Sequence, residues 1–388
     1  MPPRGQGLTI LHTESSNGWG GQEIRIVTEA EGMQRRGHRV LIAATPSSRL
    51  LTEAGGRGVE TVRVEMEGWR MPAAFGRLRA VIRRERVDIV NTHSSRDSWL
   101  ASASAMLSRR RPILIRTRHL STPIERSIVT RFLYNTLPDA VITTGESIRT
   151  TMVERHGFDA SKIVSIPTGV DTSVFSRALA TGAFREAFGI PATVPLVGIV
   201  AVLRSWKGHE DFVDAARLVL KEIPDARFVI VGDGPRAPNI RDYIDRLGLA
   251  AAVTMTGHRA DVATVLASLD VFVLSSFGHE GVPQAVLQAM AMEVPVVATN
   301  VGAVSEVVRD GETGLLAPPR VPEALAAHIV SVLRRNALRR ALASAGRRLI
   351  EERYRLDVML DRLDALYDDL LRRRGRIAHS AMREARGW

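Results

Sequence analysis

The chain has 388 residues, of which 45% are hydrophobic and 24% charged, a composition typical of a soluble globular protein. It contains no Cys, which excludes disulfides, Cys-ligated zinc and thiol catalysis and suits a reducing compartment. No apolar run approaches about 18 residues, so no transmembrane helix is expected. The opening sequence MPPRGQGLTILHTE has no apolar segment of signal-peptide length, which favours a cytoplasmic location.

The formal net charge of +11 favours anionic partners such as nucleotide phosphates, acidic lipids or nucleic acids. Aromatic residues make up only 5% of the chain and do not alternate with basic residues as they do in proteins that stack nucleic-acid bases. We therefore expect no nucleic-acid partner.

Short apolar runs alternate with amphipathic stretches over the first 150 residues. Strands are predicted at residues 8–13, 40–45, 88–93, 113–118 and 140–144, and helices at 22–36, 73–86 and 98–107. This alternation favours a parallel sheet that is covered by helices on both faces.

The alternation breaks at residues 166–175, IPTGVDTSVF, where Pro, Gly and Asp indicate turns. It then resumes, with strands predicted at residues 196–202, 227–234, 253–257, 271–276 and 294–299 and a charged amphipathic helix at 356–374. A chain of this length also favours two domains. We predict two doubly wound Rossmann-like domains, residues 1–170 and 171–355, joined near 167–185, with residues 356–388 forming a C-terminal helix and a basic tail.

Three loops that follow predicted strands have the composition of phosphate-binding loops. Gly20 and Gly21 lie in SNGWGGQE, Arg204 and Lys207 in LRSWKGHEDF, and Gly232 in VGDGPR. Glycine allows backbone N–H groups to approach an anion, and Arg and Lys suit a diphosphate. Each loop alone could be an ordinary solvated turn, but three at strand ends favour a ligand site between the domains.

A fourth loop has the sequence HEGVPQAVLQAM, beginning at residue 279. Pro283 suits the first position of a helix, where no backbone N–H is needed, and the N–H groups of that helix would face an anion. Glu280 can accept hydrogen bonds from sugar hydroxyls, and Gln288, further along the helix, can reach a ribose. The alternatives are a loop acid for Glu280 and a surface or capping amide for Gln288.

The sequence EGVPQAVLQAM followed by VPVVAT resembles the signature of the family 4 glycosyltransferases, which have the two-domain GT-B fold. Further matches run along nearly the whole chain: GGQE at 20–23, RRGHRVLI at 35–42, DIVNTH at 88–93, PDAVITTGESIR at 138–149, IPTGVDTSVF at 166–175, WKGHEDF at 206–212, VGDGP at 231–235 and GAVSEVVRDGETGLLAPP at 302–319. In this order and spacing the motifs are specific. The resemblance implies an α/β GT-B architecture in which the domains face each other across a cleft and the C-terminal helix crosses back.

The family resemblance also implies a retaining transfer of a sugar from a UDP- or GDP-linked donor, with no bound metal or other cofactor. The absence of an Asp-x-Asp motif is consistent with this, because such a motif would position a divalent ion on the diphosphate. By resemblance, Lys207 would hold the donor diphosphate, and Gly20 or Gly21 would approach it from the other domain. Val202 stands where the family has an Arg, and Arg204 is expected to substitute for it.

The sugar and ribose contacts are likewise implied by the resemblance. Glu280 would bind donor-sugar hydroxyls, the backbone of residues 281–282 (Gly281 and Val282) would help to place the sugar, and His93 would point at it. Together with Lys207, His93 and Glu280 form the expected catalytic set. Gln288 replaces the ribose-binding Glu of the family and lacks its charge. Thr168 stands where the family usually has Asn.

The acceptor is expected on the N-terminal domain, where Arg and His residues surround the amphipathic segment PIERSIVTRFLYN. These residues are Arg116, Arg118, His119, Arg126 and Arg131. A basic amphipathic helix can lie on an anionic bilayer, which favours a glycan or lipid-linked acceptor of lipopolysaccharide type at the cytoplasmic face of the inner membrane. The alternative is a solvated Arg face on a helix that packs on the core.

Two other functions remain open from the sequence. One is a nucleotide-sugar 2-epimerase, which would use the same fold without an acceptor. The other is a non-catalytic module that binds polyanions or membranes, which would show salt-sensitive binding without nucleotide selectivity.

Overall fold

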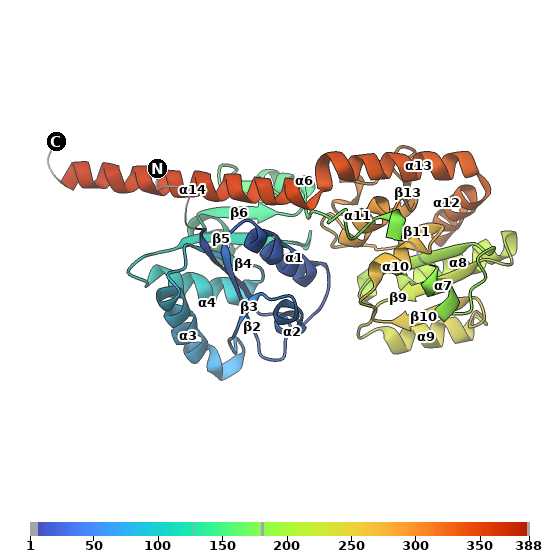
Figure 1. The fold of residues 1–388 in the computed structure, drawn as a ribbon, viewed down its shortest axis with the longest axis horizontal. Coiled ribbons are helices and arrows are strands. Elements are labelled where there is room, and N and C mark those ends of the chain that lie inside the picture. The colour runs from blue at the N-terminus through green and yellow to red at the C-terminus, as the bar shows by residue number, and fades with distance from the viewer. Residues whose placement is uncertain (1–6, 126, 180–181, 386–388) are drawn as a thin grey trace.

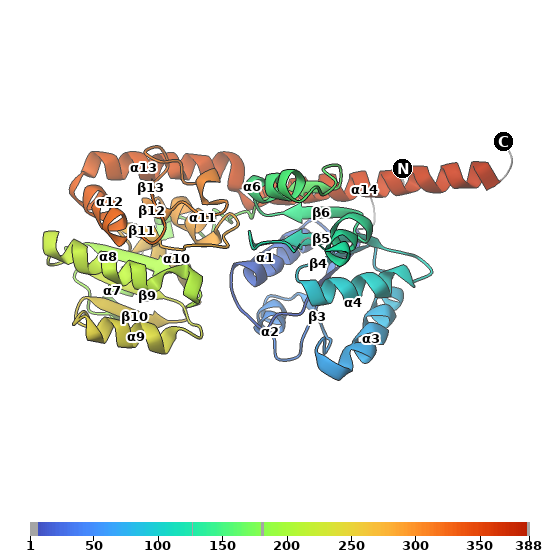
Figure 2. The ribbon, with the colours of Figure 1, turned by 180° about the vertical axis from the view of Figure 1, so that it is seen from behind.

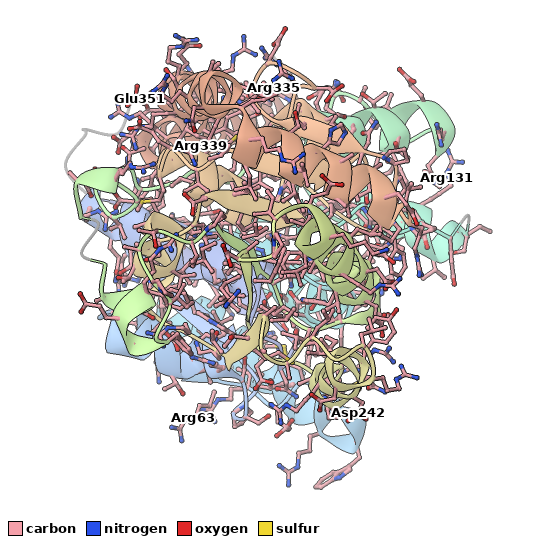
Figure 3. All side chains as sticks on the ribbon, turned by 90° about the vertical axis from the view of Figure 1, so that its right-hand side faces the viewer. Arg63, Arg131, Asp242, Arg335, Arg339 and Glu351 are labelled. Atoms are coloured by element: carbon pink, nitrogen blue, oxygen red, sulfur yellow. The ribbon has the colours of Figure 1, made fainter. Side chains whose placement is uncertain are left out.

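The computed structural model describes residues 7–125, 127–179 and 182–385, with side chains described as far as residue 375. Two parallel sheets lie side by side, each with its own helices, and the long helix α14 runs along the top of the N-terminal half (Figure 1). Figure 2 shows the same arrangement from behind, and Figure 3 shows charged side chains such as Arg63 and Asp242 projecting from the exterior. The predicted fold class is confirmed.

The N-terminal sheet has seven parallel strands in the order β3-β2-β1-β4-β5-β6-β7. The strands are β1 (Thr9–Glu14), β2 (Arg39–Ala44), β3 (Glu60–Arg63), β4 (Ile89–Thr92), β5 (Ile113–Arg118), β6 (Ala140–Thr143) and β7 (Ile163–Ser165). The five predicted strands of this half are confirmed to within one residue. Sequence reasoning missed β3 and β7, the two short edge strands, because an edge strand buries too little to carry a continuous apolar run.

The C-terminal sheet has six strands in the order β10-β9-β8-β11-β12-β13. They are β8 (Leu196–Val200), β9 (Arg227–Val231), β10 (Val253–Gly257), β11 (Val271–Leu274), β12 (Val296–Thr299) and β13 (Leu315–Ala317). The edge strand β13 was again missed. In each sheet the strand order reverses, between β1 and β4 and between β8 and β11, and such reversals are where doubly wound sheets bind ligands.

Helices cover both faces of each sheet, and separate apolar clusters fill the layers between. The helices are α1 (Gly21–Arg35), α2 (Arg49–Gly56), α3 (Met71–Arg84), α4 (Ser95–Met106), α5 (Ile128–Arg131), α6 (Glu146–Thr150), α7 (Ala183–Ala187), α8 (His209–Glu222), α9 (Ala237–Arg246), α10 (Val262–Ala267), α11 (Gln284–Ala291), α12 (Pro322–Arg334), α13 (Asn336–Leu349) and α14 (Leu356–Ala385). The three helices predicted in the N-terminal half correspond to α1, α3 and α4.

Helix α14 follows the C-terminal sheet in sequence but packs on α1 of the N-terminal half (Figure 1). Leu360 fits against Gly32 so closely that a Cβ atom at Gly32 would lie 2.5 Å from Leu360 Cδ1. Arg36 forms ion pairs of 2.7 Å with both Asp361 and Asp364 of α14. The expected return of the C-terminal helix to the first domain is therefore present.

The two connections between the halves touch each other where they cross. The backbone N–H of Val170 donates to Tyr354 O at 2.8 Å, and that of Leu356 donates to Val170 O at 2.9 Å. Gly169 lies against this crossing, because a Cβ atom there would be 2.7 Å from Leu356 Cα and 2.9 Å from Arg355 O. The division of the chain at residues 170 and 355 remains a prediction, and both positions belong to this crossing.

We expect Gly169→Ala to destabilise the protein by about 1–3 kcal/mol, because the new methyl group meets backbone atoms that cannot rotate away. The matched control is Gly76→Ala in α3, where a Cβ atom meets nothing within 4 Å. Removing this exposed helical glycine should leave stability unchanged or slightly higher. Thermal unfolding of both variants measures the difference, and equal midpoints would contradict the assigned contact.

Candidate active site

The glycine-rich loop after β1 faces the C-terminal half. Gly20 caps the N-terminus of α1, and a Cβ atom on it would lie 3.1 Å from Val202 Cγ2. A Cβ atom on Gly18 would lie 3.3 Å from Arg204 Nη2, and one on Gly21 would lie 3.9 Å from Gln284 Oε1. The structure thus brings the predicted Gly20 opposite the basic loop of the other domain, and Gly21 opposite the start of α11.

The basic loop after β8 is held by close contacts of glycine backbones. Gly208 has a φ of +66°, and a Cβ atom there would lie 1.9 Å from Ser275 O. Gly232, with φ +141°, approaches Ala201 equally closely, since its Cβ atom would lie 1.9 Å from Ala201 O. Gly232 was expected to bind the donor. It supports the segment that leads to Arg204, and its direct donor contact stays a prediction.

Lys207 and Glu280, two members of the expected catalytic set, are in contact. Lys207 Nζ lies 2.5 Å from Glu280 Oε1, and the Ser276 hydroxyl donates to the same oxygen at 2.6 Å. The Glu280 side chain is 5% exposed and that of Lys207 is 20% exposed, so the pair is largely withdrawn from water. His279, just before Glu280, has a left-handed φ of 62°, which turns the loop at this point. A donor that bound both groups, as predicted, would have to compete with this ion pair.

Residues 281–282 lie directly against the N-terminal domain. A Cβ atom on Gly281 would be 2.5 Å from both His119 O and Thr144 Oγ1, and Val282 N–H donates to Thr144 O at 3.4 Å. Only glycine fits at residue 281 without moving these loops apart. The peptide expected to place the donor sugar therefore belongs to the interface between the domains.

Helix α11 begins one residue later than predicted. Pro283 is its N-cap, with an extended ψ of 122°, and Gln284 is the first helical residue. The expectation that Pro283 occupies the first helical position is wrong, because its extended ψ delays helix entry. Gln288 is buried at 8% exposure. Sequence reasoning missed Gln284, whose buried Oε1 has no hydrogen-bond partner among the described residues and faces the glycine loop. Its position directly after Pro283 was the available signal.

His93 is the central member of a chain of three buried histidines. Its Nε2 lies 2.9 Å from His12 Nδ1, and its Nδ1 lies 2.9 Å from His119 Nε2. Burial lowers the pKa of His12 and lowers those of His93 and His119 well below the usual range, so the three rings are neutral. The Glu29 carboxylate, 3.9 Å from His12 Nε2, favours a proton on that nitrogen. His119 Nε2–H then donates to His93 Nδ1, and His93 Nε2–H donates to His12 Nδ1.

This chain of histidines bears on the sugar contact expected of His93. Both of its ring nitrogens are already bonded, so a hydrogen bond to a sugar would require one of them to be released. His119 was expected on the acceptor side, but its backbone carbonyl lies against Gly281 of the donor-sugar loop. Thr168, which replaces the family Asn, accepts from the buried Arg25 at 3.1 Å. The catalytic role of His93 stays a prediction.

A second buried polar group lies where β1 ends. The single hydroxyl of Ser94 is 2.7 Å from both Glu14 Oε1 and Asp97 Oδ1 and can donate to only one of them. Asp97 also accepts from His93 N and Ser94 N, each at 2.9 Å. Burial, followed by the nearby charge of Asp97, raises the pKa of Glu14 to about 8. Glu14 therefore carries a proton at neutral pH, and burial also raises the pKa of Asp97.

The arginines expected on the acceptor side are mostly enclosed by protein. The Arg116 guanidinium lies 4.2 Å from the centroid of the Tyr134 ring and donates to Ser95 Oγ at 3.4 Å. Arg118 donates to Tyr134 Oη at 2.8 Å. Arg126 lies outside the described residues. A direct acceptor contact of Arg116, Arg118 or His119 stays a prediction.

We expect replacement of Glu14 by Gln to remove a pH dependence of stability. The folded pKa of about 8 lies above the ordinary value of 4.5, so the wild-type stability gained from this group is present below pH 4.5 and is lost as pH rises to about 8. Between these two pKa values, the free energy of unfolding of the wild type falls by about 1.4 kcal/mol per pH unit relative to the variant. The measurement is urea unfolding of wild type and Glu14→Gln at several pH values between 5 and 8. Parallel stability curves would contradict a neutral Glu14.

Comparisons with known proteins agree with this geometry. Residues 19–174 match the family described as "Glycosyltransferase Family 4", and residues 194–335 match "Glycosyl transferases group 1". The chain is 31% identical over 188 residues to the alpha-D-kanosaminyltransferase of Streptomyces kanamyceticus, covering 48% of each protein. It is 28% identical to the phosphatidyl-myo-inositol mannosyltransferase of Mycobacterium tuberculosis, covering 90% of this chain and 93% of that protein.

Coverage differs among these relatives. The match to the UDP-Gal:alpha-D-GlcNAc-diphosphoundecaprenol alpha-1,3-galactosyltransferase of Escherichia coli, at 28% identity, covers 61% of this chain and 64% of that enzyme. In several relatives, including the kanosaminyltransferase, the matched part spans only about half of the protein.

Solved structures show the same fold. A glycosyltransferase from Rickettsia africae ESF-5 superposes with a TM-score of 0.83 at 24% identity, covering 94% of this chain and 99% of that chain. Anabaena Alr3699/HepE, solved in complex with UDP-glucose, superposes with a TM-score of 0.84 at 20% identity, covering 93% and 100%. Together the matched motifs, the two family models and the fold show that this chain belongs to the family 4 glycosyltransferases of GT-B fold.

Proposed function

We propose that the chain is a retaining glycosyltransferase that moves a sugar from a UDP- or GDP-sugar to an acceptor hydroxyl in the synthesis of a cell-envelope glycan or lipopolysaccharide. The observation that carries this proposal is the contact between Lys207 and Glu280, opposite the glycine loop of the other domain. A cation for a diphosphate and a carboxylate for sugar hydroxyls are thereby in one place. The names of the relatives, which include galactosyl- and mannosyltransferases, support this reading.

Donor binding would exchange the partners of the buried ion pair. The diphosphate draws Lys207 away from Glu280, and Arg204 adds a second positive charge. Glu280, still bonded by Ser276, then accepts hydrogen bonds from the sugar hydroxyls. Gln288 contacts the ribose through a neutral amide. The UDP and UDP-glucose in the Anabaena structures support a uridine donor among the possible bases.

The chemical step proposed here uses no carboxylate nucleophile, because Glu280 is engaged by Lys207 and Ser276 before the donor binds and by Ser276 and the sugar hydroxyls afterwards. Retaining glycosidases, in contrast, use two carboxylates about 5 Å apart. The acceptor hydroxyl attacks the anomeric carbon from the side of the leaving group. The new C–O bond forms as the bond to the diphosphate breaks, and the departing phosphate oxygen takes the hydroxyl proton. Lys207, Arg204 and the first-turn N–H groups of α11 stabilise the diphosphate without a metal.

A peripheral membrane contact is part of this proposal. Ile128 and Val129 of α5 are 87% and 60% exposed, Phe132 is 39% exposed, and Arg131 projects from the same surface (Figure 3). Exposed apolar side chains beside a cation suit the interface of an anionic bilayer, here the cytoplasmic face of the inner membrane. Among the described residues, no helix has both the length and the apolar character needed to span a bilayer.

A thermal-shift screen tests the donor assignment with UDP, GDP, ADP, CMP and their sugars, with and without EDTA. We expect one nucleotide class to raise the unfolding midpoint selectively and without dependence on EDTA, because only the folded site binds it. Lys207→Ala should abolish that shift and most of the turnover. Lys221→Ala, an exposed Lys at the other end of α8, is the matched control and should retain both.

Equal shifts with every polyanion would favour the binding-module alternative. Near-normal turnover in Lys207→Ala would contradict the role of Lys207. Consumption of the UDP-sugar without any acceptor would favour an epimerase.

Sedimentation with vesicles tests the membrane contact. We expect the protein to pellet with phosphatidylglycerol vesicles but not with phosphatidylcholine vesicles, and Ile128→Glu with Val129→Glu to reduce pelleting about tenfold, since both apolar insertion and charge attraction suffer. Val174→Glu, at an apolar residue that is 50% exposed elsewhere, is the control. Equal pelleting with the two lipids would count against this contact.

A further inference from the structure

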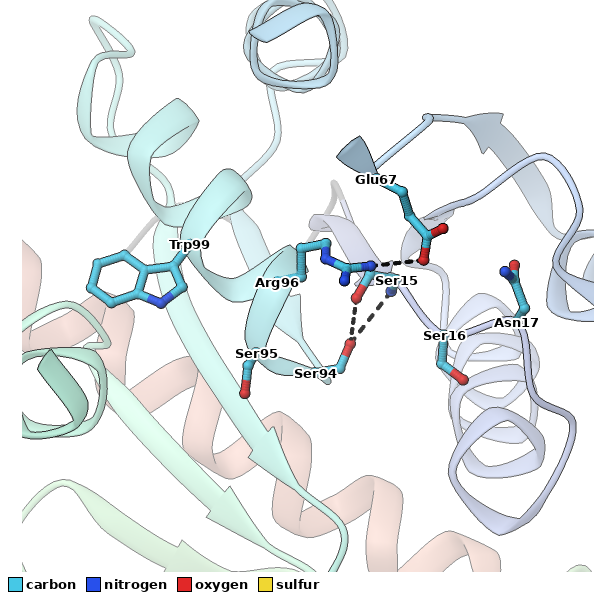
Figure 4. A pocket seen from close by; sticks show the side chains of 8 residues that line it. All are labelled: Ser15, Ser16, Asn17, Glu67, Ser94, Ser95, Arg96 and Trp99. Carbon is cyan, nitrogen blue, oxygen red and sulfur yellow. Dashed lines mark hydrogen bonds and ion pairs between the residues drawn. The ribbon is translucent and has the colours of Figure 1, made fainter. Parts of the chain in front are cut away.

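A cavity of about 560 Å³ lies in the N-terminal domain beside the donor loops (Figure 4). Its lining comes from the loop after β1, the start of α4 and the residue before a short 3-10 helix at 68–70. The lining residues are Ser15, Ser16, Asn17, Glu67, Ser94, Ser95, Arg96 and Trp99. The residues expected to meet the acceptor, Arg116, Arg118 and His119, do not line it, although Arg116 donates to Ser95 from behind.

The cavity adjoins the proposed donor site. Ser16 accepts a hydrogen bond from Gly18 N–H at 3.0 Å, and a Cβ atom on Gly18 would lie 3.2 Å from Ser16 Oγ and 3.3 Å from Arg204 Nη2. A ligand in the cavity would thus be separated from the diphosphate-binding Arg204 by only this turn of chain.

No cation among the lining residues is unpaired. Arg116, which donates to Ser95 but does not line the cavity, has no ion pair among the described residues. Arg96 Nη1 pairs with Glu67 Oε1 at 2.7 Å, which neutralises the only cation in the lining. The N-terminus of α4 would attract an anion, but the Asp97 carboxylate already accepts from the N–H groups of His93 and Ser94. Arg204, in contrast, has no carboxylate partner within the described part of the chain. The proposed phosphate-binding residue Arg204 and the neutral lining of the cavity are therefore distinct.

The lining suits a molecule with several hydroxyl groups and an apolar face. Serine hydroxyls can donate or accept, and the Arg96–Glu67 pair offers donors and acceptors side by side. Asn17 Oδ1 already accepts from Thr45 and Ser47, which leaves its NH₂ group to donate. The indole of Trp99 stacks on Phe132, with ring centroids 6.1 Å apart and an interplanar angle of 19°, so its orientation is held. An ordered indole can pack on the C–H face of a pyranose.

We propose that this cavity binds the acceptor through an uncharged sugar residue, with Trp99 against the sugar ring and the serines, Asn17, Arg96 and Glu67 on its hydroxyls. This inference rests on the proposed transferase function and narrows its acceptor to a neutral saccharide end. A charged headgroup such as a glycerol or inositol phosphate would find no free cation here.

The test is ligand-observed saturation-transfer NMR with two sets of probes. The neutral set is the methyl α- and β-glycosides of glucose, galactose, mannose, N-acetylglucosamine and rhamnose, and the anionic set is glycerol 3-phosphate and inositol 1-phosphate. We expect at least one neutral glycoside to bind and both anions to fail. Trp99→Ala should weaken glycoside binding about fivefold, and Trp99→Phe should weaken it less because an aromatic face remains. Trp69→Ala, at a Trp that is 85% exposed outside the cavity, is the matched control.

Removing the compensating acid gives a second, independent measurement. Glu67→Gln leaves Arg96 unpaired, so glycerol 3-phosphate should bind this variant and not the wild type. Binding of either anion to the wild type, failure of every glycoside, or equal effects of the Trp99 and Trp69 variants would overturn the proposal. The nucleotide shift reports separately on the donor site: a normal shift with no glycoside binding overturns the cavity assignment alone, and glycoside binding through Trp99 with no nucleotide shift overturns the transferase function alone.

Discussion

The ion pair between Lys207 and Glu280 is the interaction on which the candidate site depends. The two residues come from the loops after β8 and β11, on either side of the strand reversal in the C-terminal sheet. Both charges are largely removed from water, so each needs the other, or a ligand group of the same charge as its partner, to remain ionised at low cost. In the ligand-free site, Lys207 and Glu280 therefore compensate each other's charge. Under the proposed function, a nucleotide diphosphate would replace Glu280 as the partner of Lys207, and sugar hydroxyls would replace Lys207 as the partner of Glu280.

Glycines determine how closely the two domains approach around this pair. Gly281 presses on His119 and Thr144 with no room for a side chain, and a Cβ atom at Gly20 would make a tight contact of 3.1 Å with Val202 Cγ2. The crossing at Val170 and the packing of α14 on α1 hold the domains at their other edge. Any larger residue at these contacts would widen the space in which the donor is to be held, so the same contacts serve both the fold and the site.

Polar groups buried beneath the site avoid charge wherever no partner is available. The three histidines are kept neutral by burial, and Glu14 holds a proton beside Asp97. In the cavity proposed for the acceptor, Arg96 forms an ion pair with Glu67. At the N-terminus of α4, the Asp97 side chain accepts a hydrogen bond from Ser94 N–H. Arg204 has no carboxylate partner in the described part of the chain, and the other cation of the candidate site, Lys207, is paired with Glu280. This division suits a reaction in which one substrate is a diphosphate and the other is an alcohol.

Sequence by itself determined the architecture and the positions of the glycine-rich and basic loops at strand ends, because both depend on local patterns. Buried parallel strands require apolar runs, and close backbone contacts and helix starts require Gly and Pro, so β1, β4, β8, β11 and the loops after them could be read directly. Edge strands such as β3 were not predicted, because a half-covered strand does not need a continuous apolar run. Only the tertiary structure decided that His12, His93 and His119 bond to one another, that Arg116 lies behind Ser95, and that Trp99 shares a cavity with Asn17. The residues of these pairings are 21 to 82 positions apart along the chain. No local pattern records a contact that arises only when separate strands end at the same edge of a sheet.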